Sequence, residues 1–145
     1  MKNLINIKKK IADNWFKSLQ NKIIYQFQIL ENETGKKSGK KIKIFIKRKW
    51  EKNNKKEGGG ISYILSGGEL FDKVGVNQST VTGQFEKNFR SKIFGAEKNG
   101  KYWASGISVV AHMKNPKIPA FHFNTRFIVT SKEWFGGGMD ATPSF

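Results

Sequence analysis

Both histidines of the chain, two of its three prolines and one of its three arginines fall within residues 112–126. The flanking segments, "YWASGISVVAH" and "AFHFNTRFIVT", have the apolar and β-branched composition of strands. Pro116 and Pro119 cannot donate to a strand ladder and therefore belong to the connection between them. The pattern predicts an antiparallel pair of strands that carries an unusual concentration of chemically active side chains.

Alternation along a strand predicts that the polar side chains of this pair share one face. Ser108 and His112 lie on the same side of the first strand, and His122, Asn124 and Arg126 on the same side of the second. Phenylalanines take the opposite side and predict a core-facing surface. The polar group offers a general acid or base, neutral hydrogen-bonding groups and a guanidinium clamp for a carboxylate. An ordinary solvated strand face is the alternative, and it stays open at this point.

Two further considerations bear on the chemistry of this group. Lysine outnumbers arginine eight to one in the chain, so a guanidinium at position 126 suggests that two-pronged donor geometry matters there. Two histidines without any cysteine cannot complete a tetrahedral zinc site from this segment alone. Near the C-terminus, "WFGGGMDATPSF" predicts a glycine turn followed by a helix start at Thr142-Pro143. Asp140 is then either an ordinary turn carboxylate or an acceptor for the N–H group of a ligand.

The elements that must position these residues follow from periodicity. Apolar residues from Ile11 through Trp15 to Leu30 recur near 3.6 residues and predict a helix packed on a sheet, within a helical lead-in over residues 1–35. Residues 42–145 carry the sheet, with strands around 42–46 and 76–81. The basic stretch 47–56 is interpreted as a solvated loop, and Gly58 to Gly60 as another loop. We expect one domain, residues 1–145, of the α+β class.

Composition limits the class of partner. The net charge is +16, from 27 basic and 11 acidic residues, which suits either nucleic acid or an anionic small substrate. The lysines are spread along the chain without interleaved aromatic residues, which favours the small anion. The absence of cysteine fits a reducing compartment, and no apolar run approaches the roughly 20 residues of a membrane span. We therefore expect a soluble cytoplasmic protein that binds neither membrane nor nucleic acid.

The ordered motifs "GGGISYIL", "FDKVGVNQSTVTG", "WASGISVVAHMKNPKIPAFHFNTRF" and "WFGGGMDATP" together resemble the oxygen-dependent coproporphyrinogen-III oxidases of heme biosynthesis. The likeness runs from about Trp50 to the end of the chain. It implies a large, mostly antiparallel β-sheet flanked by α-helices on both faces, of which this chain carries the N-terminal portion. It also implies a homodimer in the full-length family.

The resemblance implies roles for individual residues. His122 matches the family's proton donor, and Asn124, Thr125 and Arg126 match its substrate-binding Asn-x-Arg. Ser108 matches a serine in contact with substrate, and Asp140 an aspartate that holds pyrrole N–H groups. His112 matches a histidine to which some members are assigned a divalent metal such as manganese.

The activity that the resemblance implies is oxidative decarboxylation of two propionates of coproporphyrinogen III, giving protoporphyrinogen IX. Molecular oxygen is the oxidant, and no organic cofactor is used. Departures from the family pattern include Met113, Ala120, Ala141 and Phe145, and the chain stops about where the family is half complete. A truncated, inactive tetrapyrrole-binding fragment and a basic nucleic-acid-binding protein are the alternative functions.

Overall fold

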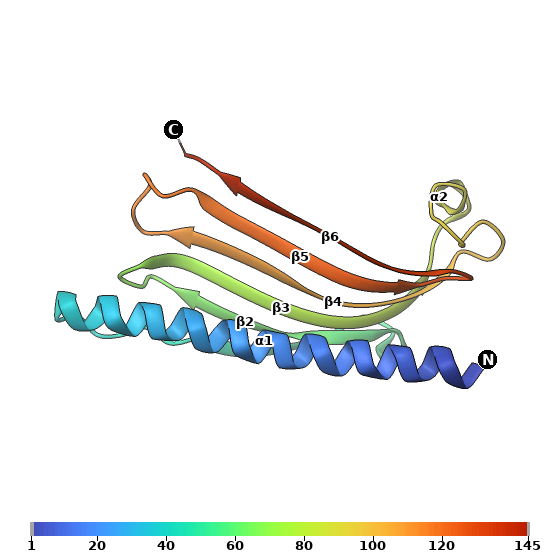
Figure 1. The fold of residues 1–145 in the computed structure, drawn as a ribbon, viewed down its shortest axis with the longest axis horizontal. Helices are drawn as coiled ribbons and strands as arrows, with labels where there is room; N and C mark the ends of the chain where they lie inside the picture. Colours follow the sequence, from blue (N-terminus) through green and yellow to red (C-terminus); the bar gives the residue numbers. More distant parts are fainter. Residues whose placement is uncertain (1, 145) are drawn as a thin grey trace.

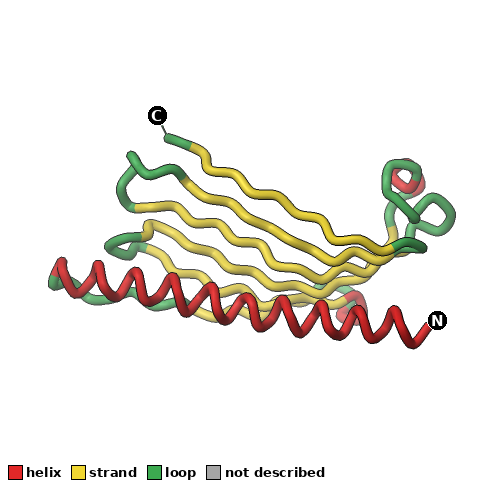
Figure 2. The backbone as a smooth tube through the Cα atoms, in the orientation of Figure 1, coloured by secondary structure: helices red, strands yellow, loops and turns green. Residues whose placement is uncertain are grey.

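A single six-stranded sheet, with one long helix on one of its faces, makes up most of the protein (Figure 1). The computed structural model describes residues 2–144. The helices and strands are α1 (Lys2–Ser38), β1 (Ile46–Glu51), η1 (Lys55–Glu57), β2 (Gly58–Ser66), β3 (Phe71–Gln84), α2 (Lys87–Arg90), β4 (Lys101–Met113), β5 (Ala120–Val129) and β6 (Glu133–Thr142). Each strand pairs antiparallel with the next along the chain, so the predicted α+β class with an antiparallel sheet is confirmed (Figure 2).

Helix α1 runs along the strands and contacts β3 and β4. It continues three residues beyond the predicted lead-in and ends at Ser38, where Gly39 adopts a φ of 67°. Glycine takes this left-handed conformation without the steric cost that other residues meet, which stops the helix. Within residues 2–144, neither helix combines the length and the hydropathy that crossing a bilayer requires.

The face of α1 that packs on the sheet includes Leu19, Ile23 and Phe27 of the predicted stripe but departs from that stripe in the N-terminal part of the helix. Phe16 and Ala12 are buried, whereas Ile11 and Trp15 remain 63% and 50% exposed. Gln20 is buried as well, because its amide donates to the carbonyls of Ile61 and Val76 in the sheet. Polar partners in the sheet therefore set the rotation of the helix together with its apolar residues.

The core lies between α1 and the sheet. Its buried apolar side chains are Ala12, Phe16, Leu65, Phe71, Val74, Val76, Ile107, Val109, Ala111, Phe127 and Val129. Phe121 and Phe123 pack against this cluster, which confirms the predicted phenylalanine face of β5. Alternate residues of β4 and β5 therefore point away from the helix.

A buried carboxylate fixes the end of α1 to the sheet. Glu31 is fully buried and accepts hydrogen bonds from the backbone N–H groups of Glu69, Leu70 and Phe71. These residues form the end of the β2–β3 connection and the start of β3, so the side chain provides acceptors for three donors that no strand ladder would satisfy.

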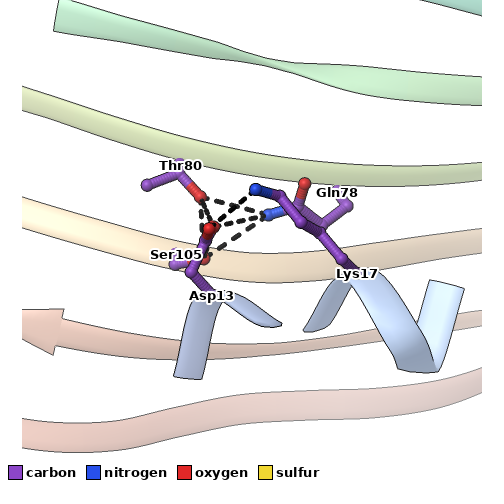
Figure 3. A network of polar contacts seen from close by, with 5 residues as sticks. All are labelled: Asp13, Lys17, Gln78, Thr80 and Ser105. Atoms are coloured by element: carbon purple, nitrogen blue, oxygen red, sulfur yellow. Dashed lines mark hydrogen bonds and ion pairs between the residues drawn. The ribbon is translucent and has the colours of Figure 1, made fainter. Parts of the chain in front are cut away.

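A second polar cluster lies between the N-terminal half of α1 and the middle of the sheet (Figure 3). Asp13 Oδ1 accepts hydrogen bonds from Thr80 and from Ser105 Oγ at 3.2 Å, and Oδ2 accepts one from Lys17 Nζ at 2.7 Å. Gln78 Nε2 lies 3.4 Å from Asp13 Oδ1 and 3.1 Å from Thr80 Oγ1. These directional hydrogen bonds specify the position of α1 along the strands more closely than apolar contacts alone would.

Several strand boundaries differ from the sequence-based predictions. Residues 47–51, expected in a solvated loop, belong to β1, and the triple glycine belongs to β2. Gly58 has a φ of 94°, and a Cβ atom there would lie 2.1 Å from the carbonyl oxygen of Thr80. Glycine is thus needed for close strand pairing at this position. Ile42 and Ile44 precede β1 instead of forming a strand.

The C-terminal segment is a strand and not a turn followed by a helix. Gly136, Gly137 and Gly138 lie within β6 and pair with Arg126, Thr125 and Asn124 of β5. Thr142 ends the strand, and no helix begins at Pro143 within the described residues 2–144. The ladder with β5 pairs one side of the backbone of this glycine-rich segment and holds it extended, which local sequence signals alone do not predict.

Candidate functional site

The sheet face turned away from α1, here called the open face, carries the predicted site residues. It is formed by even-numbered residues of β1, β2, β4, β5 and β6 and by odd-numbered residues of β3. Ser108, His112, His122, Asn124 and Arg126 all belong to it, as the alternation of β4 and β5 predicts.

Strand register arranges the open face in rows that cross all six strands. One row holds Arg48, Ser62, Asn77, Ser108, Asn124 and Gly138. The row on one side of it holds Ile46, Ile64, Gly75, Val110, His122 and Asp140, and the row on the other side Trp50, Gly60, Ser79, Gly106, Arg126 and Gly136. Small and polar residues dominate, so much of this face is flat and able to form hydrogen bonds.

His122 and Asp140 form the most defined pair of the site. Their strands place them directly opposite one another, with His122 Nδ1 2.8 Å from Asp140 Oδ1. Thr142 Oγ1 donates to the same oxygen at 2.9 Å. The hydrogen bond from His122, followed by that from Thr142, holds the pKa of Asp140 below its ordinary value. An ionised Asp140 favours the His122 tautomer with a proton on Nδ1, which leaves Nε2 free on the open face.

The remaining predicted residues surround this pair. The rings of His112 and His122 lie edge to face with centroids 5.6 Å apart. Ser108 lies directly opposite Asn124 in the ladder between β4 and β5. Arg126 is exposed, and a Cβ atom at Gly106 would lie 2.5 Å from its Cγ atom. The lack of a side chain at Gly106 therefore lets the Arg126 stem lie across β4.

Thr125 does not join the group. It lies opposite Ile107 on β4 and Gly137 on β6, on the face that α1 occupies. The predicted Asn-x-Arg group therefore presents two side chains, Asn124 and Arg126, on the open face. Thr125 determines their spacing through its backbone.

Sequence reasoning missed three residues that extend the site toward β1. Asn77 Oδ1 accepts hydrogen bonds from Trp50 Nε1 at 2.9 Å and from Ser62 Oγ at 2.8 Å. Each residue comes from a different strand, so only the register between β1, β2 and β3 brings them together. The spacing of Asn77 from Gly75 and Ser79 shows which face it shares with them, but not what lies beside it.

The predicted metal does not fit the described residues alone. Across residues 2–144, no group of three or more histidine, cysteine, aspartate or glutamate side chains could hold a metal ion. His112 and His122 provide at most two imidazoles, fewer than the ligands a divalent ion takes.

Comparison with known proteins finds one matching family model and a set of similar proteins. A family model described as Coproporphyrinogen III oxidase matches residues 11–145. An oxygen-dependent coproporphyrinogen-III oxidase of Rickettsia felis is 51% identical over 137 residues, covering 94% of this chain and 48% of the relative. The Rickettsia typhi protein of the same name is 50% identical over 138 residues, with the same coverage. The chain thus spans about half the length of the curated relatives it matches.

Proposed function

The chain belongs to the coproporphyrinogen III oxidase family, and from this premise we propose that it works as the N-terminal half of an oxygen-dependent coproporphyrinogen-III oxidase. The reaction converts two propionates of coproporphyrinogen III to vinyl groups and gives protoporphyrinogen IX in heme biosynthesis. Each conversion breaks one C–C bond to release carbon dioxide and removes one hydrogen, and two electrons pass to molecular oxygen. No organic cofactor takes part in the proposed scheme.

The observation that carries the proposal is the gathering of His122, Asp140, Ser108, Asn124 and Arg126 on one open face of the sheet. An open face with a guanidinium and neutral hydrogen-bonding groups suits a broad macrocyclic substrate that bears carboxylates and pyrrole N–H groups. The net charge of +16 attracts such an anion from solution.

Each residue has a proposed role. Arg126 grips a propionate through two parallel hydrogen bonds. His122 transfers a proton through Nε2, because Nδ1 is committed to Asp140. The second oxygen of Asp140 accepts a pyrrole N–H, while Ser108 and Asn124 orient the macrocycle. Thr125 contributes its backbone.

Three further features are proposals, two from the family resemblance and the cytoplasmic location from composition. They are a homodimeric assembly, a cytoplasmic location and a divalent metal such as manganese at His112. No step is assigned to the metal. Activity measured with added manganese and with a chelator tests that feature separately.

The proposed function is tested by supplying the other half of a relative. The chain is incubated under air with coproporphyrinogen III, with and without a separately expressed C-terminal half of the Rickettsia felis protein. We expect vinyl product when both pieces are present, and none when the His122→Ala variant is used in place of the wild-type chain. Failure of the combined pieces to bind substrate or form product would overturn the proposal. Retention on DNA that falls steeply with salt would instead favour a nucleic-acid-binding protein.

Arg126 provides a sharper test at the level of one residue. Arg126→Lys keeps the charge but loses the two-pronged geometry, so we expect binding of coproporphyrin III to weaken by about 1.5–3 kcal/mol, the worth of a charge-assisted hydrogen bond. Arg126→Ala should bind more weakly still. Fluorescence titration with this stable, oxidised tetracarboxylate measures both.

Arg90→Lys is the matched control, because Arg90 lies in α2 and donates to the carbonyl of Phe85. Unchanged affinity of Arg126→Lys would show that positive charge alone is sufficient. Unchanged affinity of Arg126→Ala would show that Arg126 does not hold a propionate.

A further inference from the structure

A hollow of about 350 Å³ lies on the open face over β2, β3 and β4, and residues of the site already described form part of its lining. Its lining is Ser62, Ile64, Lys73, Gly75, Val76, Asn77, Ser108, Val110 and His112. We propose that this hollow is a subsite for a short alkyl carboxylate. Under the proposed function, on which this identification rests, the occupant is a second propionate of the tetrapyrrole, apart from the one held by Arg126.

The floor of the hollow is Gly75. It lies between Ile64 of β2 and Val110 of β4 in one row, so apolar side chains flank it on both sides. A Cβ atom built on Gly75 meets no atom within 4 Å. The space above it is therefore open and apolar at its sides, which suits the methylene groups of a carboxylate arm.

Asn77 provides hydrogen-bond donors at one end of the hollow. The indole N–H of Trp50 can only donate, so the amide oxygen of Asn77 must face it, and Ser62 donates to the same oxygen. Oδ1 is thereby directed toward β1 and β2, and the planar amide directs Nδ2 away from them. Among residues 2–144, Nδ2 has no hydrogen-bond partner. Its two N–H groups are left for an acceptor in the hollow.

Lys73 provides positive charge at the other end. Along β3, Lys73, Gly75 and Asn77 lie on the same face, so Lys73 and Asn77 flank the glycine floor from opposite ends, and both line the hollow. Lys73 is exposed, and no acidic side chain of the described residues lines the hollow. A carboxylate would meet donors and positive charge there without a competing anion.

The test uses two probes, because the hollow and the proposed function can fail independently. Propionate at constant ionic strength probes the hollow alone, and nuclear magnetic resonance follows the side-chain NH₂ of Asn77. Coproporphyrin III probes the whole face by fluorescence titration. Gly75→Val fills the hollow with a residue that strands accept well, and Gly75→Ala fills it in part. Urea unfolding checks that both variants keep the wild-type stability.

We expect propionate to shift the Asn77 NH₂ signals of the wild type and not those of Gly75→Val. Coproporphyrin III affinity should fall about tenfold in Gly75→Val, roughly the loss of one net hydrogen-bonded contact, and less in Gly75→Ala. Lys73→Gln should also lower the affinity. Lys47→Gln, an equal loss of charge on the other face of β1, should not.

The outcomes separate the two proposals. Asn77 NH₂ signals that do not shift on addition of propionate, or that shift equally in Gly75→Val, would overturn the subsite. Equal coproporphyrin III affinity of the wild type and Gly75→Val would overturn it as well, and the proposed function would stand. Propionate binding in the hollow without any coproporphyrin III binding would support a carboxylate site and remove the tetrapyrrole as its occupant.

Discussion

One oxygen of Asp140 accepts hydrogen bonds from both His122 and Thr142. The other oxygen has no hydrogen bond to the described residues 2–144. This division lets one carboxylate fix the histidine and still accept an N–H group from a ligand. The His122 hydrogen bond is the main cause of the lowered pKa of Asp140, so the carboxylate stays ionised to a lower pH than an ordinary aspartate.

Asp140→Asn should relax the tautomer of His122. A carboxylate only accepts, so it selects Nδ1–H, whereas a carboxamide can present either its oxygen or its NH₂ group to Nδ1. We expect the share of the Nδ1–H tautomer to fall in Asp140→Asn, as measured by ¹H–¹⁵N correlation spectra of the ring. Thr142→Val, which removes the other hydrogen bond to the same oxygen, is the control and should leave the tautomer unchanged. An unaltered ring spectrum in Asp140→Asn would contradict this role.

Residue-level chemistry is the part of the site that the sequence predicts best. The two-residue period of a strand is enough to bring Ser108 and His112 onto one face and His122, Asn124 and Arg126 onto one face of the next strand. Sequence cannot show that Asn77 accepts hydrogen bonds from Trp50 and Ser62, because that contact depends on the register of three strands. The same limit hides the pairing of His122 with Asp140.

At the scale of elements, Glu31 joins α1 to the sheet. Glu31→Ala leaves three backbone donors without their acceptor, and one unsatisfied buried donor costs about 1–3 kcal/mol. Because water can reach part of the space left behind, we expect a net loss of about 3 kcal/mol in the free energy of unfolding. Urea denaturation measures it, and Glu33→Ala, an exposed position on the same helix, should change little. Equal unfolding midpoints for the two variants would exclude the anchoring role.

The contribution of Asp13 to the stability of the protein depends on pH. Burial alone would raise the pKa of Asp13, but hydrogen bonds from Lys17, Thr80 and Ser105, with the charge of Lys17, outweigh it and bring the pKa below 3.8. A carboxyl whose pKa is lower in the folded state contributes stability above its unfolded pKa and loses it as pH falls through the folded value. The free energy of unfolding should therefore decline below about pH 4.

In Asp13→Asn the free energy of unfolding should decline less at low pH, as measured by urea denaturation at a series of pH values. Asp72→Asn, an exposed aspartate of β3, is the control. If the free energy of unfolding of Asp13→Asn declines at low pH as much as that of the wild type, other carboxyl groups cause the decline.

The sequence predicts an element well where a periodic pattern extends over many residues, and poorly where glycine dominates. The 3.6-residue pattern predicted α1 and the packing of Leu19, Ile23 and Phe27. In the N-terminal part of the helix Phe16 is buried instead of Trp15, because Asp13 and Gln20 must reach partners in the sheet. Glycine runs favour turns and close strand pairing alike, so Gly136 to Gly138 were assigned to a turn. Only pairing with β5 distinguishes the two, and that contact is absent from local sequence.

At the scale of the whole molecule, the sheet has two edge strands, β1 and β6, and an apolar surface that the described residues leave uncovered. Ile11 and Trp15 of α1 line a groove with Phe135 of β6, and Phe135 and Met139 are 67% and 73% exposed. Unpaired edges and apolar patches favour association. We expect the chain to self-associate as its concentration rises, as measured by sedimentation.

Phe135→Lys and Met139→Lys should each reduce this association, because a charge on the patch opposes its burial. Ile118→Lys, in the loop between β4 and β5 and 44% exposed, is the control. A concentration-independent monomer for the wild type would contradict the prediction.

The order of the strands has a consequence for synthesis. Each strand pairs with the one made just before it, so the sheet can grow hairpin by hairpin while the chain leaves the ribosome. The side chains of the open face are then added in the same order, with Asn77 first, then Ser108 and His122, and Asp140 last. A polypeptide released before β6 would already display Arg126 and His122, but His122 would lack its carboxylate. Premature termination of translation in that interval therefore yields a face that carries Arg126 and His122 without the carboxylate that fixes the proton of the histidine.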